Sequence, residues 1–124
     1  MSDATYEDAQ ILLQTAQWWT MAGVNEAMNW IWSDEFEMDY ESFIEKHPVG
    51  SDKFGEVNKV LGAFETVGAL WRNGLFNEKL LFDWMAVGMV WSRVSGIALG
   101  IREAAGNERL YEHFEAMAAA AENY

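Results

Sequence analysis

Apolar residues in this chain recur three and four positions apart over most of its length. Between positions 52 and 73 the recurring residues are Phe54, Val57, Val60, Leu61, Phe64, Val67, Gly68 and Trp71. This spacing places them on one face of an α-helix, whereas the strict alternation and hairpin turns typical of strands are missing. The pattern therefore predicts an all-α protein.

The N-terminal part of the chain carries a clear helix start. Thr5 and Asp8 stand three positions apart, the spacing of a capping box, so we expect the first helix to begin there. Gly23 weakens the helical pattern, and Asn25 is the type of residue that caps a new helix. The pattern leaves open whether residues 5–33 form one kinked helix or two.

The remaining apolar stripes predict one short helix and three longer ones. They are expected near 39–46, over about 52–73, over roughly 78–104 and across 110–121. We expect the helix over 78–104 to be central, because apolar residues spread round more than one side of it. Gly96 and Gly100, four positions apart on that helix, would let another helix approach closely.

Glycine and asparagine mark the links between the predicted helices. Gly74 suits the left-handed position after a helix, and Asn77 suits the N-cap of the next one. The links at 74–77 and 105–107 are short, which favours antiparallel neighbours. With a single domain covering residues 1–124, the prediction is an antiparallel bundle of four or five helices.

The charge of the chain limits the partners that it can have. Twenty acidic residues stand against eight basic ones, and the resulting charge of −12 repels nucleic-acid phosphates and anionic membranes. The longest apolar stretch, Leu80 to Ile101, contains Asp83 and Arg93, so it predicts a core helix rather than a membrane span. We expect no direct nucleic-acid binding and no membrane location, and a basic macromolecular partner is favoured.

The location follows from two further features of the sequence. Cysteine is absent, which excludes disulfides, a thiol nucleophile and thiolate metal ligands, and is compatible with a reducing compartment. The acidic, polar N-terminus lacks the basic start and apolar run of a secretory signal. We therefore expect a cytoplasmic protein.

No motif for catalysis, or for a bound metal or cofactor, is present in the sequence. Neither His47 nor His113 has a glutamate three positions before it, as a di-iron carboxylate bundle requires. The acidic run at 35–41 alternates like calcium ligands, but Tyr40 and Lys46 stand where an EF-hand needs glycine and glutamate. Nucleophile elbows and phosphate-binding glycine loops are also missing. We expect no catalytic residue, no metal, no cofactor and no enzymatic activity.

Four charged residues lie on or beside apolar helix faces, namely Glu65, Arg72, Asp83 and Arg102. Buried charge is costly unless it is paired, so the sequence predicts a buried polar network. Asp83 with Arg72, and Glu65 with Arg102, are the pairs that we expect. Such pairs would fix the register of the helices; the alternative is a polar site inside an apolar pocket.

Seven tryptophans must be placed in a chain of this size. The later ones sit on or beside predicted core stripes, but Trp18, Trp30 and Trp32 are hard to bury all at once. Because exposed aromatic residues are enriched at protein interfaces, these three predict a surface over 18–32 that pairs with another chain, with a second copy favoured. A ligand pocket is the alternative.

Several short motifs in the second half of the chain resemble a known family. They are FETVGAL at 64–70, NGLF at 73–76, Trp91 followed by Arg102, and LYEHFE at 110–115. Together, over roughly residues 54–118, they resemble a group of small helical proteins described as a domain of unknown function. The resemblance implies helices and the glycine turn, and it brings no activity or catalytic residue. Some members of that group have membrane segments, from which this acidic, polar start departs.

These observations favour a non-enzymatic interaction or assembly module that self-associates through tryptophan-bearing helices. A first alternative is an acidic inhibitor that occupies the surface of a basic nucleic-acid-binding protein, on account of the charge and the acidic run at 34–45. A second alternative is a cryptic enzyme or ligand carrier that uses Asp83, Arg72 and Arg102.

Overall fold

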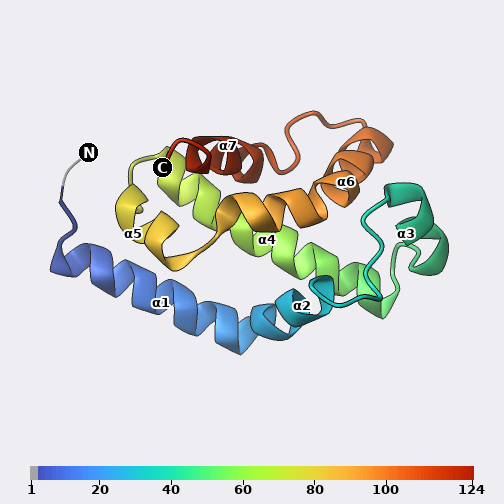
Figure 1. Ribbon diagram of the computed structural model, residues 1–124, viewed down its shortest axis with the longest axis horizontal. Coiled ribbons are helices and arrows are strands. Elements are labelled where there is room, and N and C mark those ends of the chain that lie inside the picture. The colour runs from blue at the N-terminus through green and yellow to red at the C-terminus, as the bar shows by residue number, and fades with distance from the viewer. Residues whose placement is uncertain (1–2) are drawn as a thin grey trace.

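A computed structural model describes residues 3–124 of the 124-residue chain, and every regular element in that range is a helix (Figure 1). The helices are α1 (Tyr6–Ala22), α2 (Val24–Ile31), α3 (Tyr40–Lys46), α4 (Asp52–Arg72), α5 (Glu78–Trp84), α6 (Val87–Ala105) and α7 (Glu112–Ala121). The prediction of an all-α protein is confirmed. The described residues form seven helices rather than four or five, because the regions 5–33 and 78–104 each contain a break.

The first break lies at Gly23, so residues 5–33 form two helices. The capping box that starts α1 is present: the Asp8 amide donates to Thr5 Oγ1 at 3.1 Å, and the Thr5 amide donates to Asp8 Oδ2 at 2.9 Å. Gly23 has a φ of 79°, a left-handed conformation that glycine adopts at little cost, and it precedes α2 directly. The prediction that Asn25 caps α2 is wrong, because its side chain donates to Thr20 instead.

The second break divides the predicted helix over 78–104 into α5 and α6, and no proline or glycine causes it. Met85 is extended, and the axes of α5 and α6 differ by 75°. Packing explains the bend. In α5, Leu81 is buried and Trp84 packs on Trp19 and Phe76, while the valines of α6 face α4. A straight helix would bury only one of these two apolar stripes.

Helix α4 is the element that the other helices share. It contacts α2, α6 and α7, with α1 and α2 following each other along one edge of the molecule and α7 along the opposite edge (Figure 1). The expectation that the 78–104 region is the central helix is therefore wrong for its α5 part. The reason is that α4 presents buried residues to several neighbours along its whole length.

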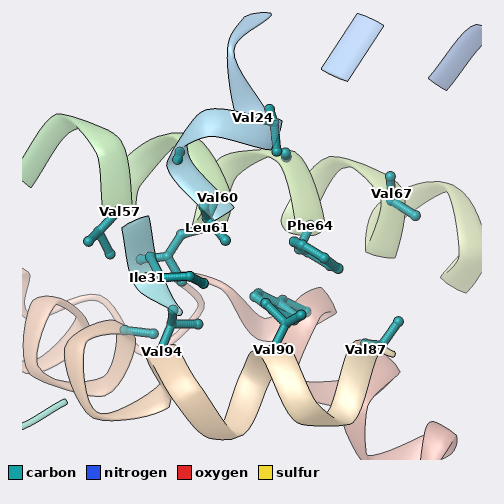
Figure 2. Close-up of a cluster of buried hydrophobic side chains, with 14 of the residues drawn as sticks. Val24, Ile31, Val57, Val60, Leu61, Phe64, Val67, Val87, Val90 and Val94 are labelled. Carbon is teal, nitrogen blue, oxygen red and sulfur yellow. The ribbon is translucent and has the colours of Figure 1, made fainter. Parts of the chain in front are cut away.

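The core lies between α4, α6 and α2. Figure 2 shows Val57, Leu61, Phe64 and Val67 of α4 facing the valines of α6, with α2 closing one side. The other labelled residues in this cluster are Val60, Val87, Val90, Val94, Val24 and Ile31. All ten of these residues are at most 3% exposed, so the cluster supplies much of the hydrophobic stabilisation of the fold.

The loop before α3 and its first residue pack directly on α6. The predicted gap at Gly96 and Gly100 is filled from within the chain: a Cβ added at Gly96 would lie 2.5 Å from the Met38 carbonyl oxygen, and one at Gly100 would collide with the Tyr40 ring. The close approach expected from this spacing is therefore intramolecular, but it comes from the loop before α3 and the first residue of α3 rather than from the side of another helix. It fixes residues 38–40 against α6.

No single helix within residues 3–124 has both the length and the apolar composition needed to cross a bilayer. Helices α5 and α6 meet that requirement only as a pair, and the 75° bend separates them.

Candidate interaction surfaces

The outer face of α1 exposes several large apolar side chains. Met21 is 80% exposed and Trp18 is 44% exposed, and Leu13 and Tyr6 also project into solvent. The opposite face of the helix carries Trp19 and Thr15, which are buried against the rest of the molecule. We call the exposed side, with the glutamines between these residues, the α1 face.

Beyond its first turn, which carries Glu7 and Asp8, the α1 face also lacks charge. No acidic or basic residue occurs from Ala9 to Asn25, although the chain as a whole carries a charge of −12. Its exposed polar residues include Gln10, Gln14 and Gln17, whose amides can both donate and accept hydrogen bonds. This is an uncharged surface on a strongly acidic molecule.

The three tryptophans predicted to share one interface are separated by the fold. Trp18 lies on the α1 face, whereas Trp30 turns inward. The centroid of its ring lies 5.3 Å from that of Phe36 and 5.6 Å from that of His47. Trp32, 46% exposed, lies beyond the end of α2. The break at Gly23 and the amphipathic pattern of α2 explain the difference, because α2 must bury Ala27 and Ile31 against α4.

Arg93 of α6 holds the end of α2. Its Nε donates to the Ile31 carbonyl at 2.6 Å and its Nη2 donates to the Ser33 carbonyl at 2.9 Å. The guanidinium also lies over the rings of Trp32 and Phe36. A cation at the C-terminus of a helix is favoured by the helix dipole, and here it satisfies carbonyls that the helix leaves free. Sequence reasoning treated Arg93 only as an interruption of an apolar stretch and missed this role.

Two hollows meet along the outer side of α6. One, of about 280 Å³, is lined by Trp32, Met38, Met89, Ser92 and Arg93. The other, of about 390 Å³, includes Phe82, Met85 and Tyr124 and again Met89 and Ser92. Met89 and Ser92 line both hollows, so the two are neighbours on the surface, and together we call them the methionine groove.

Glu65, one of the four predicted network residues, caps α7 from the neighbouring helix α4. Its carboxylate accepts the Phe114 amide at 2.9 Å and the His113 amide at 3.4 Å. The residue at the N-cap of α7, Tyr111, has a left-handed backbone and makes no side-chain cap, and its hydroxyl donates to Asn58 Oδ1 instead. Burial, followed by the charge of Glu65, raises the pKa of the Tyr111 hydroxyl.

Arg102 does not pair with Glu65, and the predicted contact between them is therefore wrong. Its Nε donates to the Leu110 carbonyl at 2.9 Å, and its Nη1 lies 3.0 Å from Glu115 Oε1. Both Glu65 and Arg102 are partly buried and hold the start of α7, each through its own contacts. The helical periodicity indicated the helix face on which each of these two residues lies. It could not indicate that the start of α7 would lie between them.

Asp83 and Arg72 do not pair either, and both are exposed. The bend between α5 and α6 turns Asp83 out of the valine stripe with which it was aligned. It instead accepts from Lys79 at 2.9 Å and from the Tyr124 hydroxyl at 2.8 Å. The hydrogen bond from Lys79, then that from Tyr124, lowers the pKa of the Asp83 carboxyl. Arg72 lies in the last turn of α4, where a cation suits the helix dipole.

The four charged residues therefore form no common network, and the hollow that Arg102 lines contains neither Arg72 nor Asp83. Within residues 3–124, no three His, Asp or Glu side chains are grouped closely enough to hold a metal ion. Exposed apolar features of the described chain include the α1 face and the methionine groove.

These observations define an all-helical domain with a large negative charge and two exposed apolar surfaces. A family model matches residues 4–121, nearly the whole chain, and the protein belongs to that family, Domain of unknown function (DUF4760). The resemblance to such a family is confirmed and extends well beyond residues 54–118. Comparison with curated proteins gives no match, and comparison with solved structures gives none either.

Proposed function

We propose that this protein is a non-enzymatic assembly module that self-associates through the α1 face. The observation that carries the proposal is an exposed apolar helix face, without a charged residue from Ala9 to Asn25, on a chain of charge −12. Contiguous exposed apolar surface is uncommon on monomers and marks interaction sites.

The charge distribution favours a second copy as the occupant of this face. Two molecules of charge −12 repel each other wherever their carboxylates meet, and that repulsion is smallest where both surfaces are neutral. A two-fold arrangement would place one α1 against the other over the uncharged residues 9–22 of the helix, about 21 Å. Trp18 and Met21 would supply apolar contact, and the glutamines would supply hydrogen bonds across the interface.

The fold supplies a rigid support for that face. We propose that α1, α2, α4, α6 and α7 make up the antiparallel bundle, with α3 and α5 as short connecting helices. Trp19 anchors α1 by packing on Phe64 and Trp84, with ring centroids 4.9 Å and 5.0 Å apart.

The absence of cysteine supports the cytoplasm as the compartment.

Sedimentation velocity over about 1 µM to 1 mM tests the proposal, because a single helix face predicts a weak, concentration-dependent dimer. We expect the wild type to move from monomer to dimer within that range. Met21→Glu, at an 80% exposed position, places a charge on each copy of the face and is expected to weaken association at least tenfold.

Val49→Glu is the matched control, since it adds the same charge at an exposed apolar residue outside α1. Circular dichroism establishes that both variants keep the helical content of the wild type. A wild type that stays monomeric up to 1 mM, or equal weakening by the two variants, would overturn the assignment of the α1 face.

A further inference from the structure

We propose that the methionine groove binds an amphipathic helix from a basic protein partner. The groove lies on α6 and beyond the end of α2, so it is a different surface from the α1 face. The inference therefore goes beyond self-association and does not depend on it.

The shape and the side chains of the groove suit an apolar helix face. Met89, 63% exposed, stands where the two hollows join, and Trp32 and Met38 are exposed at one end. Methionine side chains are flexible and polarisable, so they adapt to the apolar residues that a partner helix presents. Helices that dock in this way insert residues spaced three and four apart into a hydrophobic groove.

The charge around the groove selects a basic partner. At the Trp32 end, Asp34 and Glu35 follow in the chain and are exposed. At the other end, Glu122 lines the hollow. Carboxylates at both ends of an apolar depression attract lysine and arginine residues that flank an apolar stripe, and the overall charge of −12 adds long-range attraction.

The cations near the groove are already engaged with groups of this chain. Arg93 donates to the carbonyls that end α2, where the negative end of the helix dipole offsets its charge. Lys46 pairs with Glu37 at 2.9 Å, and Lys79 pairs with Asp83 at 2.9 Å. The same field repels nucleic acids and anionic lipid surfaces, which leaves a basic protein segment as the occupant.

The probe is a synthetic helix of about 14 leucine and lysine residues, with leucine at three- and four-residue spacing. Its binding to the full chain is followed by fluorescence anisotropy of a label on the peptide. We expect binding that weakens as salt is added. A peptide with glutamate in place of lysine, and a peptide with the leucine and lysine order scrambled, are expected to bind much more weakly.

Variants of the groove separate its apolar and its electrostatic contributions. Met89→Ser is expected to weaken binding about tenfold, because it removes the exposed thioether where the hollows meet. Leu99→Ser is the matched control on the same helix, also at an exposed apolar residue, and is expected to have no effect. Asp34→Asn with Glu35→Gln is expected to weaken binding about threefold at low salt.

Nuclear magnetic resonance locates the bound peptide. The chain has seven tryptophans, and each indole N–H gives a separate signal that Trp→Phe substitution assigns. We expect the signal of Trp32 to move on titration and that of Trp18 to stay. Movement of Trp18 alone, equal affinity of the Met89 and Leu99 variants, or tight binding of the glutamate peptide would each overturn the proposal. Sedimentation of Met89→Ser keeps the two proposals apart, because its self-association is expected to match the wild type.

Discussion

Removal of the Glu65 carboxylate is expected to destabilise the protein by about 2 kcal/mol. The Phe114 amide donates to this carboxylate at 2.9 Å, and Phe114 is fully buried, so Glu65→Ala leaves that N–H without water or another partner. A hydrogen bond to a charged group contributes about 1.5–3 kcal/mol, and the loss of a helix cap costs about 1 kcal/mol. Because the same bonds are counted in both figures, we take about 2 kcal/mol rather than their sum.

Thermal and urea unfolding, followed by circular dichroism, measure this loss. For a chain of this length, about 2 kcal/mol corresponds to a fall in Tm of roughly 6–10 °C. Glu65→Gln keeps an acceptor oxygen but loses the charge, and is expected to cost about 0.5–1 kcal/mol. Glu45→Ala, at an exposed position on α3, controls for the loss of an acidic side chain and is expected to stay within about 0.5 kcal/mol. A loss below about 0.5 kcal/mol for Glu65→Ala, or equal losses for the Ala and Gln variants, would refute the capping argument.

Three further outcomes are expected. Gly68→Ala places a Cβ 2.9 Å from the backbone that begins α7, and should lower the free energy of unfolding in urea by about 1–3 kcal/mol. Gly62→Ala on the same helix meets open space and should raise the free energy of unfolding by about 0.5–1 kcal/mol. The opposite order of stability would contradict the packing argument. Arg93→Met should cost about 1.5–3 kcal/mol in the same assay, because it leaves the Ile31 carbonyl without its charged donor and leaves the Ser33 carbonyl with the Phe36 amide alone. A change below about 0.5 kcal/mol would contradict this argument. The hydrogen bond from Lys79 lowers the pKa of the Asp83 carboxyl. This contact therefore stabilises the fold above the ordinary aspartate pKa, and the stabilisation is lost as the pH falls through the lowered pKa. A carboxyl ¹³C titration should place the Asp83 midpoint below that of a free aspartate, and Lys79→Met should raise this midpoint.

Local signals were sufficient to predict most helix starts. Thr5 with Asp8, and Asn77, act as the N-caps that their side chains and spacing indicated, because such a cap is a contact between residues two or three positions apart. The turn at Gly74, with a φ of 74°, follows from the same kind of local preference. Asn25 failed as a cap because Gly23 ends α1 and leads directly into α2.

Tertiary contacts, which the spacing of residues in the sequence does not reveal, decided which of the predicted interaction residues stay exposed. Trp18 and Trp32 remain exposed, whereas Trp30 turns onto Phe36 and His47. The methionine groove was not foreseen, because its residues come from the chain after α2, from α5, from α6 and from the C-terminal end of the chain. A weak signal existed in the isolated Arg93 within an apolar stretch, since a buried guanidinium requires acceptors from elsewhere in the chain.

The sequence by itself determined that the protein is helical, where most helices begin, and that a neutral apolar segment lies within an acidic chain. These properties depend on spacing and on contacts between near neighbours. Only the tertiary structure decided the bend at Met85 and the partners of the charged residues. The bend has no local cause: it lets Leu81 and the α6 valines bury in different directions, and it turns Asp83 outward to Lys79. Glu65 likewise acquired its role because α7 packs beside α4 and presents unsatisfied amides to it.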